Sequence, residues 1–443
     1  MPRLEVLRLA VPAEPLRLCQ RLRAAGLPEV ALLHAGSEGG WGRASWLTAA
    51  PDAESTALDP VTDDDLGPLE GPLAAAPRWW GTIPYEARRA ALERPAYVPA
   101  DPRPTPRFAR EPRWYRYRAA AHVAPQQAEV RLVGDDPAAL ARLRRALEDT
   151  ADPSPLGARY TVSAEPPDEH RARIAAAREL ILDGDLYQVN LARRLAIALT
   201  SGDAWSLYEQ LATRAPAPFG AVLPLGDGAT VLSLSPELLL EATPRGSASS
   251  AGGDWPGFGR LVTEPIKGTR PRGTTPEEDD RLAAELDADA KERAELAMIV
   301  DVERNDLGAV CDFGTVRVAL PPTVRRLPRV HHRLARVVGE ARGDATRREV
   351  LEALVPSGSV SGAPKRRAME VIATLEADRR GLYTGGLGYV SHDGGLRLAM
   401  AIRCAVMGPD GRGEYFTGGG IVAGSDPDRE VAETGWKARP LVE

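Results

Sequence analysis

Cysteine is scarce in this chain, with only Cys19, Cys311 and Cys404 among 443 residues. The three are far apart, so they form none of the close spacings that mark a zinc site, and an odd, sparse set is typical of a reducing compartment. Long apolar runs are missing too, since no segment approaches the ~18 apolar residues that a membrane-spanning helix needs. The first residues, Met1 to Val6, lack the apolar core of a signal peptide. We therefore expect a cytoplasmic protein with no membrane contact.

An excess of positive charge is also absent. The formal net charge is −6, so the composition gives no basic footprint for nucleic acid. Hydrophobic residues make up 43% and charged residues 27%, which is typical of globular rather than disordered proteins. An anionic small-molecule substrate remains compatible with this charge, because local arginines and glycine-rich segments can bind it.

Internal repeats and a regular alternation of strand and helix are missing as well. Turn-bounded runs predict strands at 30–34, 129–133, 221–224 and 231–234, and apolar spacing predicts helices at 137–149 and 170–182. This mixture favours an α+β fold with antiparallel sheets over a doubly wound one. Proline-rich segments indicate a connector at 99–112 and a linker at 151–167, and residues 245–253 predict a loop. The linker separates region 1–150 from region 168–443.

What is present begins with Lys267, in the run Pro265-Ile-Lys-Gly-Thr-Arg-Pro-Arg-Gly273. Prolines and glycines around the lysine predict a short loop. A lysine amine attacks carbon only when it is neutral, so a nucleophilic lysine must lie where burial or nearby cations lower its pKa. A solvated loop lysine is the alternative that this short run leaves open.

A long helix is predicted from Thr275, whose hydroxyl can cap it, with a proline in the first position and Glu278 completing a capping box. Its apolar positions continue to residue 300. Glu295 falls in this increasingly apolar stretch, where a carboxylate needs a cation, a metal or a hydrogen-bond network. A surface pair with Lys291, four residues earlier, is the alternative.

A second acidic helix is predicted from Asp426, a capping residue followed by proline. Glu430, Glu433 and Lys437 share one face of this helix. Carboxylates on a rigid helix suit Mg²⁺, which takes few of them and keeps water or substrate oxygens in its shell. An ordinary Glu–Lys pair is the alternative, and spacing alone cannot place the two acidic helices side by side.

Glycines and an arginine supply candidate anion-binding groups. Gly418, Gly419 and Gly420 follow a predicted strand, so their backbone N–H groups could cradle a carboxylate or phosphate, or form a plain tight turn. Arg403 interrupts a predicted buried strand at 398–406. A buried guanidinium favours a carboxylate partner, which either a substrate or a protein acid can supply.

Two further clusters of nitrogen-bearing side chains stand out. Lys365, Arg366 and Arg367 begin another predicted helix, where three cations oppose the macrodipole and suggest a nearby anion. His331 and His332 are adjacent in a predicted strand, so only one of them can face a given site. With no third ligand in view, we do not expect a histidine metal site.

In their order along the chain, these segments resemble the chorismate-utilising enzyme family over residues 168–440. The matching blocks are Gly184–Ala192, Ser235–Leu239, Pro265–Thr269, Lys291–Gly308, Ser361–Lys365, Tyr383–Tyr389, Ala401–Arg403 and Gly418–Val422. The weaker resemblance of residues 1–150 to the N-terminal, anthranilate synthase component I-like region of the family rests on Leu32-Leu33, Gly42–Ser45 and Trp80-Gly81. Region 168–443 is then expected to be the chorismate-binding catalytic domain.

The resemblance implies a single large intertwined domain of two antiparallel sheets, stacked at a steep angle with helices outside. It implies Mg²⁺ held mainly by Glu295 and Glu433, with Glu430 close by, against the ring carboxylate of chorismate. It makes Glu237 the general acid at the departing C4 hydroxyl, with His332 in support. The residues that it implies for substrate binding are Thr269, Tyr383, Arg403, Gly418, Gly419, Gly420 and Lys437.

Two positions refine the implied reaction. Water-using isochorismate and salicylate synthases carry a lysine base where Gln188 stands, so its absence argues against water as the nucleophile. Anthranilate synthases carry alanine where Lys267 stands, and lysine is typical of the aminodeoxychorismate synthase component I branch. The resemblance therefore implies conversion of chorismate and ammonia to 4-amino-4-deoxychorismate, on the route to 4-aminobenzoate and folate. Anthranilate synthase component I is the alternative, and a catalytically silent chorismate-binding subunit is a second one.

The sequence has no glutaminase-type cysteine block, so the resemblance implies that ammonia comes from a separate glutamine amidotransferase subunit. Two residues depart from the family pattern. Glu264 stands where an arginine is common, and Ala335 replaces a usual serine. These departures bear on loop geometry and rate rather than on the type of reaction.

Overall fold

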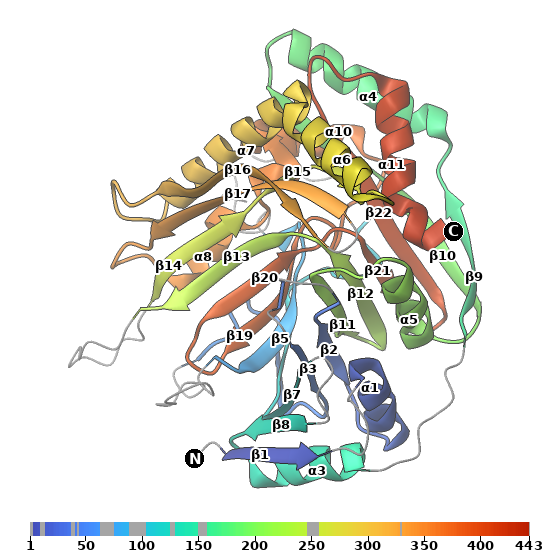
Figure 1. The fold of residues 1–443 in the computed structure, drawn as a ribbon, viewed down its shortest axis with the longest axis vertical. Coiled ribbons are helices and arrows are strands. Elements are labelled where there is room, and N and C mark those ends of the chain that lie inside the picture. The colour runs from blue at the N-terminus through green and yellow to red at the C-terminus, as the bar shows by residue number, and fades with distance from the viewer. Residues whose placement is uncertain are drawn as a thin grey trace.

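In the computed structural model, the described residues are 3–8, 14–36, 40–41, 44–62, 75–87, 103–124, 129–148, 157–245, 257–327 and 330–442. They form two antiparallel sheets that stack face to face, with helices on the outer sides (Figure 1). The predicted α+β class is therefore confirmed.

The first sheet has 12 strands among the described residues. Along the sheet they are β1 (Arg3–Arg8), β8 (Glu129–Gly134), β7 (Ala119–Val123), β3 (Ser45–Thr48), β2 (Ala31–His34), β11 (Phe219–Gly226), β12 (Ala229–Ser235), β21 (Cys404–Met407), β22 (Arg412–Ile421), β10 (Gln188–Ser201) and β18 (Gly362–Ala363), while β9 (Arg159–Ala164) also pairs with β10. The predicted strands at 30–34, 129–133, 221–224 and 231–234 all lie in this sheet.

The second sheet has 10 strands in the described part of the chain. They run in the order β15 (Ile266–Pro271), β17 (Val330–Glu340), β14 (Phe258–Glu264), β13 (Leu238–Pro244), β20 (Leu396–Met400), β19 (Gly386–Ser391), β5 (Pro77–Ile83), β6 (Arg113–Arg116) and β4 (Ala53–Ser55), with β16 (Arg317–Arg326) beside β17. Both sheets mix strands from residues 1–150 with strands from residues 168–443. The two regions are thus woven into one domain, as the resemblance implied.

The layer between the sheets is the central core. Leu33 and Val231 from the first sheet meet Trp80, Leu387 and Ala399 from the second, and all five side chains are buried. Removing a large apolar side chain of this kind from water stabilises the fold by about 1.5–3 kcal/mol. The alternation of inward and outward side chains along each strand holds both sheets in register against this layer.

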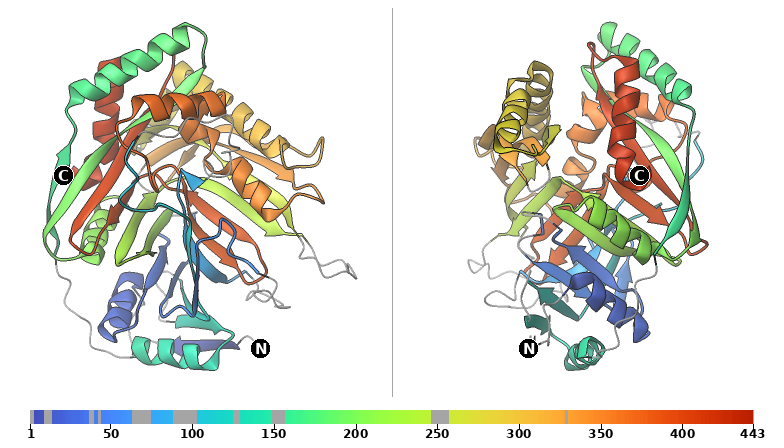
Figure 2. Two further views of the ribbon diagram at one scale, coloured as in Figure 1. Left: turned by 180° about the vertical axis from the view of Figure 1, so that it is seen from behind. Right: turned by 45° about the vertical axis from the view of Figure 1, so that its right-hand side comes forward.

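Helices cover the outer faces of both sheets. The first sheet packs against α1 (Pro15–Ala24), α3 (Pro137–Glu148), α5 (Ala204–Arg214) and α11 (Pro427–Val442). The second packs against α7 (Ala290–Gly308), α8 (Arg347–Leu354) and α9 (Gly358–Ser361), while α4 (Pro167–Leu182) and α10 (Lys365–Leu375) cover the end of β10. Helices α1 and α3 lie at the opposite end of the molecule from α4, α7 and α10 (Figures 1 and 2).

The single long helix predicted from Thr275 to residue 300 is wrong, because the chain forms two helices there. Helix α6 (Pro276–Ala288) ends at Asp289, whose backbone is extended and whose carboxylate caps α7 by accepting the Glu292 N–H at 3.1 Å. The predicted cap by Thr275 is present, since its hydroxyl accepts the Glu278 N–H at 3.2 Å. The Glu278 carboxylate accepts hydrogen bonds from the Thr274 hydroxyl and backbone N–H, and it also interacts with the Thr275 backbone N–H, as the predicted capping box requires.

The single strand predicted at 398–406 is also wrong. Strands β20 and β21 occupy its two ends and belong to different sheets. Arg403 lies at the crossing with a φ of 55°, a left-handed conformation that a continuous strand cannot contain.

Other expectations about loops changed in the same way. Gly418, Gly419 and Gly420 lie within β22 and pair with β10, so they do not form the loop that we expected. Within the predicted linker 151–167, residues 159–164 form β9. Residues 246–253 of the predicted loop, 99–102 of the predicted connector and 151–156 of the linker lie outside the described part of the chain.

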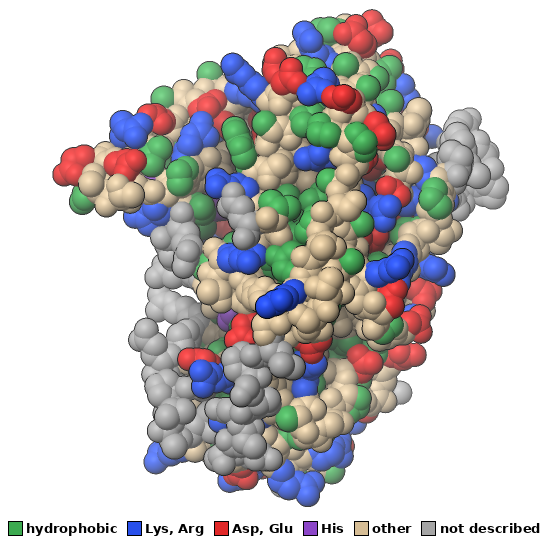
Figure 3. Space-filling model, turned by 90° about the vertical axis from the view of Figure 1, so that its right-hand side faces the viewer, with side chains coloured by type: hydrophobic (Ala, Val, Ile, Leu, Met, Phe, Trp, Pro, Cys, Tyr) green, Lys and Arg blue, Asp and Glu red, His purple; other side chains and the backbone are tan. Residues whose placement is uncertain are grey.

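The surface shows no concentration of one sign of charge on the face seen in Figure 3, where Lys and Arg side chains alternate with Asp and Glu. No helix among the described residues is long and apolar enough to cross a membrane.

Candidate active site

Lys267 lies on β15 at the edge of the second sheet and not on a loop. Between Ile266 and Thr269 the pairing of β15 with β17 shifts register, and Gly268 adopts a φ of 87°. Such a bulge redirects a side chain away from the ordinary alternation of a strand. The Lys267 side chain reaches the first sheet, because a Cβ on Gly420 would lie 3.4 Å from its Nζ.

We expected burial or nearby cations around Lys267; its side chain is half-buried, and the charged neighbours that interact with it are acids. The carboxylates of Glu237, Glu295 and Glu433 all interact electrostatically with its amine. Lys267 therefore joins the predicted general acid to the predicted metal ligands, and the three sets of residues form one site.

Glu237, between β12 and β13, is the buried carboxyl of this site. Its Oε1 accepts a hydrogen bond from Ser359 Oγ at 3.2 Å, and the backbone N–H of Ile266 donates to the same carboxyl group. Burial raises the pKa of Glu237 to about 7, an effect that the nearby Lys267 charge opposes. A carboxyl group with such a pKa can hold a proton near neutral pH and donate it, as a general acid must.

His332 and Thr269 face each other across β17 and β15. The Thr269 hydroxyl and His332 Nδ1 are 2.9 Å apart. Burial lowers the pKa of His332 to about 4, with a further contribution from Arg403, so the imidazole is neutral at pH 7. His331 points the other way, to Asp279 at 2.8 Å, as the alternation of a strand requires.

Arg403 and Tyr383 lie near His332 on the side of the first sheet. The half-buried Arg403 guanidinium has no ion pair with any acid in the described part of the chain, so the alternative of a structural Arg–Asp or Arg–Glu pair is not observed. The Tyr383 ring stacks on Phe416 with centroids 5.6 Å apart, and a Cβ on Gly418 would lie 2.9 Å from its hydroxyl. Both side chains remain available for a ligand.

The two acidic helices come together, which spacing alone could not establish. Lys291 Nζ on α7 lies 3.6 Å from Glu295 Oε1 and 3.1 Å from Glu430 Oε1 on α11. Glu433 Oε1 is 2.6 Å from Lys437 Nζ, which also donates to the Gly418 carbonyl at 2.8 Å. The ordinary Glu–Lys pairs that we weighed as alternatives are thus present, but they join the two helices into one cluster.

Because Gly419 has no side chain, the carboxylates of Glu430 and Glu433 lie close to the backbone of β22. A Cβ there would lie 3.3 Å from Glu430 Oε2 and 3.8 Å from Glu433 Oε1. At the next position, Gly420, a Cβ would lie 3.2 Å from the side-chain amide of Gln188, which is buried and has no hydrogen-bond partner among the residues that the structure describes. The glycine strand therefore lets acids, an amide and Lys267 approach the same stretch of backbone.

The carboxylates suit a hard cation, although they are not arranged around one point. Burial raises the pKa of Glu295, and Glu430 and Glu433 add to the shift against the opposing Lys267 and Lys291. In the described part of the chain, no group of three His, Cys, Asp or Glu side chains is placed to hold a metal ion. Mg²⁺ needs only one or two carboxylates when water and substrate oxygens complete its shell, so the donor set fits this ion.

The anion expected near Lys365, Arg366 and Arg367 is supplied by the protein itself. Lys365 forms a buried ion pair with Asp306, and the other two pair with Glu370, Arg367 also contacting Asp185. These cations are structural. The two departures from the family pattern are also accommodated, because Glu264 pairs with Arg336 and Ala335 is fully buried.

Sequence reasoning missed Glu303, Ser357 and Ser359, which lie behind Glu237. Glu303 occupies the apolar stripe of α7 formed by Leu296, Ile299, Val300 and Leu307. An acid in such a stripe was a signal that could have identified it.

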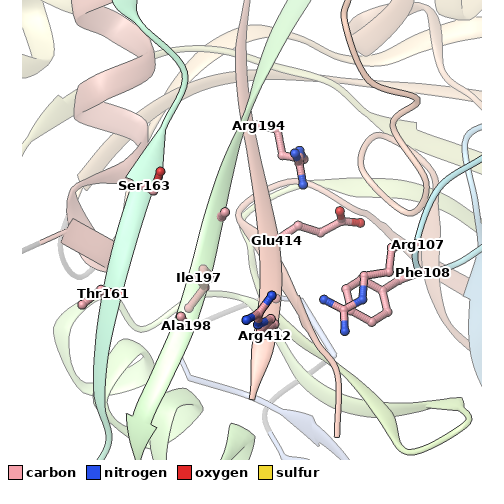
Figure 4. A pocket seen from close by; sticks show the side chains of 11 residues that line it. Arg107, Phe108, Thr161, Ser163, Arg194, Ile197, Ala198, Arg412 and Glu414 are labelled. Carbon is pink, nitrogen blue, oxygen red and sulfur yellow. The ribbon is translucent and has the colours of Figure 1, made fainter. Parts of the chain in front are cut away.

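A cavity of about 310 Å³ lies elsewhere, beside β9, β10 and β22 (Figure 4). Arg107 and Arg194, which line it, pair with Asp410 and Asp378, and burial raises the pKa of Glu414 to about 7. None of the predicted site residues lines this cavity. Convergence of chemical groups, and not concavity, therefore places the candidate active site.

Comparison with known proteins gives a consistent family. The family model described as "chorismate binding enzyme" matches residues 33–443. Anthranilate synthase component 1 of Streptomyces coelicolor is 40% identical over 322 residues, covering 70% of this chain and 60% of that protein. A Haloarcula marismortui protein, anthranilate synthase component 1 1, is 43% identical over 272 residues, covering 61% of this chain and 52% of its own length. The chain thus spans little more than half the length of these relatives.

Solved structures agree on the fold. Anthranilate synthase component I from Streptococcus pneumoniae superposes with a TM-score of 0.71 at 25% identity, over 100% of this chain and 92% of that one. The menaquinone-specific isochorismate synthase MenF from Escherichia coli gives 0.72 at 21% identity, over 100% and 95%. The names of the curated relatives favour our alternative, anthranilate synthase component I, over the aminodeoxychorismate branch.

Proposed function

The chain belongs to the chorismate binding enzyme family, and within it we propose that the protein is the aminating subunit of an aminodeoxychorismate synthase. It would convert chorismate and ammonia to 4-amino-4-deoxychorismate, on the route to 4-aminobenzoate and folate. One observation carries this choice. Lys267 extends into the site, with its Nζ over Gly420 and its charge coupled to Glu237.

The chemistry divides between a nucleophile and an acid. Lys267 first gives its proton to a neighbouring carboxylate of the metal-ligand set and attacks C2 of chorismate as the neutral amine. Glu237 gives its proton to the C4 hydroxyl, which leaves as water. Ammonia then attacks C4, the C2–N bond breaks, and the lysine departs as a neutral amine. The proton that ammonium loses on becoming ammonia restores Glu237, so the cycle balances.

Groups around Lys267 and Glu237 would bind the substrate dianion. Arg403 forms no ion pair with any acid among the described residues, and Tyr383 and Lys437 lie along β22 beside Gly418 and the glycines that follow. We assign the two substrate carboxylates to these side chains and to the backbone N–H groups of Gly418, Gly419 and Gly420. Neutral His332, with its partner Thr269, lies beside Arg403 and is assigned as a supporting group.

We further propose that Glu295 and Glu433 hold Mg²⁺, with Glu430 beside them. When bound, the ion supplies positive charge that offsets the ring carboxylate of chorismate. The close approach of the carboxylates across α7 and α11 supports this assignment. Calorimetric titration with Mg²⁺ tests it, since Glu433→Gln should weaken binding while Glu285→Gln, on the exposed side of α6, should not. Equal affinity of Glu433→Gln and parent would overturn the assignment.

Anthranilate synthase component I is the second candidate, and the names of the curated relatives favour it. The two enzymes would share the fold, the general acid and the loss of the C4 hydroxyl. They differ in the carbon that receives nitrogen and in the presence of a lysine that can attack C2.

Product identification separates the candidates. Purified protein is incubated with chorismate, Mg²⁺ and ammonium, and the products are identified by mass spectrometry and NMR. We expect 4-amino-4-deoxychorismate. Anthranilate with release of pyruvate would establish the second candidate, and the absence of any turnover would favour a catalytically silent chorismate-binding subunit.

A further inference from the structure

A chain of hydrogen bonds runs from Glu237 into the protein, away from Lys267. Ser359 Oγ donates to Glu237 Oε1 at 3.2 Å, and Ser357 Oγ donates to Ser359 Oγ at 2.9 Å. Ser357 Oγ is also in hydrogen-bond contact with Glu303 Oε1. The residues are buried, with exposed fractions of 5% for Glu237, 3% for Ser359 and 2% for both Ser357 and Glu303. Two buried carboxyl groups are thus joined through two hydroxyls.

The backbone fixes the two hydroxyls in place. Ser357 caps α9, where its Oγ accepts the Ser359 N–H at 2.9 Å. The Ser361 hydroxyl donates to the Ser357 carbonyl at 2.8 Å. Gly358 packs tightly on α7, because a Cβ there would lie 2.0 Å from Val302 Cγ1. The chain of hydroxyls is therefore held against α7 with little freedom to break.

The charges around each carboxyl group differ. Glu237 faces Lys267 as well as Glu303. Glu303 faces Asp306 and Lys365, and the Thr263 hydroxyl lies beside it. Burial raises the pKa of both Glu237 and Glu303 to about 7, so either can hold or release a proton near neutral pH. Matched pKa values allow a proton to move between them in either direction.

We propose that Glu303 is a proton-relay residue, which re-protonates Glu237 through Ser357 and Ser359 after the C4 hydroxyl has left. This rests on the proposed role of Glu237 as general acid. The Glu303 carboxyl gives its proton to Ser357 Oγ, the Ser357 proton passes to Ser359 Oγ, and the Ser359 proton passes to Glu237. Glu303 is left as the carboxylate. It recovers the proton by the reverse path when ammonium delivers one to the site.

By re-protonating Glu237, the relay removes a carboxylate base from the site just after the C4 hydroxyl has left. After Glu237 has protonated the leaving hydroxyl, its carboxylate lies beside the new water molecule. In that state it could deprotonate the water and return it to C4, which reverses the step. A proton supplied from Glu303 prevents this return while ammonia arrives.

Oxygen exchange tests the relay directly. Turnover is run in H₂¹⁸O, and the ¹⁸O content of recovered chorismate is compared with the amount of aminated product. Glu303→Gln removes the proton store, and Ser359→Ala breaks the chain while leaving both carboxyl groups in place. We expect the ratio of exchange to product to rise severalfold in both variants. Asp301→Asn, an exposed acid on the same helix, should keep the parental ratio.

The oxygen-exchange experiment distinguishes failure of the relay from failure of the proposed function. Both candidate products require loss of the C4 hydroxyl, so the test does not depend on the role of Lys267. A parent enzyme without turnover would contradict the proposed function, whereas an active parent with an unchanged ratio in both variants would overturn the relay. Slower turnover at an unchanged ratio would likewise assign Glu303 a purely structural role, and thermal melting shows that each variant is folded.

Discussion

At the scale of single residues, the decisive feature is a lysine that a β-bulge turns out of an edge strand. Lys267→Ala should slow formation of 4-amino-4-deoxychorismate by much more than tenfold. A tenfold loss of rate corresponds to about 1.4 kcal/mol of lost transition-state stabilisation. Binding of chorismate should change little, because Arg403, Tyr383 and Lys437 lie elsewhere in the site. Steady-state product analysis and a chorismate titration measure the two effects.

Lys267→Arg is the matched control for charge. It keeps a cation beside Glu237 but cannot attack carbon, because a guanidinium stays protonated in proteins. We expect it to be as inactive as Lys267→Ala. Near-parental rates in either variant would rule out covalent catalysis and leave Lys267 with an electrostatic role.

The raised pKa of Glu237 predicts a pH dependence. A general acid must be protonated, and burial raises the pKa of this carboxyl group to about 7. At a constant concentration of free ammonia, the rate should therefore fall as pH rises through that value. Glu237→Gln should lower kcat by about 10²–10⁴-fold, the usual contribution of a positioned acid, and should abolish this limb. A profile that stays flat from pH 6 to pH 8 would contradict the assignment.

Residue identity was easier to predict than residue environment. Lys267 and Glu237 lie in short blocks whose order along the chain is informative, and the family resemblance implied Glu433 on the second acidic helix. That the acids meet around Lys267 could not be predicted from local patterns, since they come from the turn between β12 and β13, from α7 and from α11, which only tertiary packing brings together. Glu303 was missed for the same reason: its partner Ser357 lies 54 positions away.

At the scale of elements, one capping residue decides how α6 and α7 are separated. The apolar positions of the two helices share a helical period, so periodicity alone predicts one continuous helix. The break follows from Asp289, which caps α7 and pairs with Arg270 at 3.0 Å. The spacing of apolar residues predicts which face of a helix is buried, but it does not predict where one helix ends and the next begins.

Asp289→Ala should destabilise the protein by about 0.5–2 kcal/mol, the usual cost of losing an N-terminal cap. Because α7 carries Lys291 and Glu295 near that end, the variant should also bind Mg²⁺ more weakly. Denaturant unfolding and calorimetric titration measure the two effects. Asp301→Ala, in the exposed middle of α7, serves as the control, and a loss of stability as large as that of Asp289→Ala would contradict a specific role for the cap.

At the scale of the whole molecule, the sheets join strands that are far apart in sequence. Strand β2 pairs with β11, and β5 pairs with β19. Local patterns predicted many of these strands, but they carry no information about partners so distant. The stacking of two sheets was implied only by the family resemblance. The crossing of the chain between the sheets at Arg403 was not predicted at all, because a run of apolar residues looks the same whether or not it changes sheet.

The last prediction concerns the source of nitrogen. Hydrolysis of the glutamine amide commonly needs a cysteine thiolate, which forms readily only where the pKa of the thiol is lowered. All three cysteines of the chain are buried, and burial raises the pKa of each thiol, to about 11 for Cys311, to about 12 for Cys404 and higher still for Cys19. The purified protein should therefore use ammonium but not glutamine, and glutamine use should appear when a glutamine amidotransferase subunit is added. Treatment with iodoacetamide should leave ammonium-dependent turnover unchanged. Robust glutamine-dependent turnover by the isolated chain would contradict the need for a partner, because no thiol in the structure is placed to supply it.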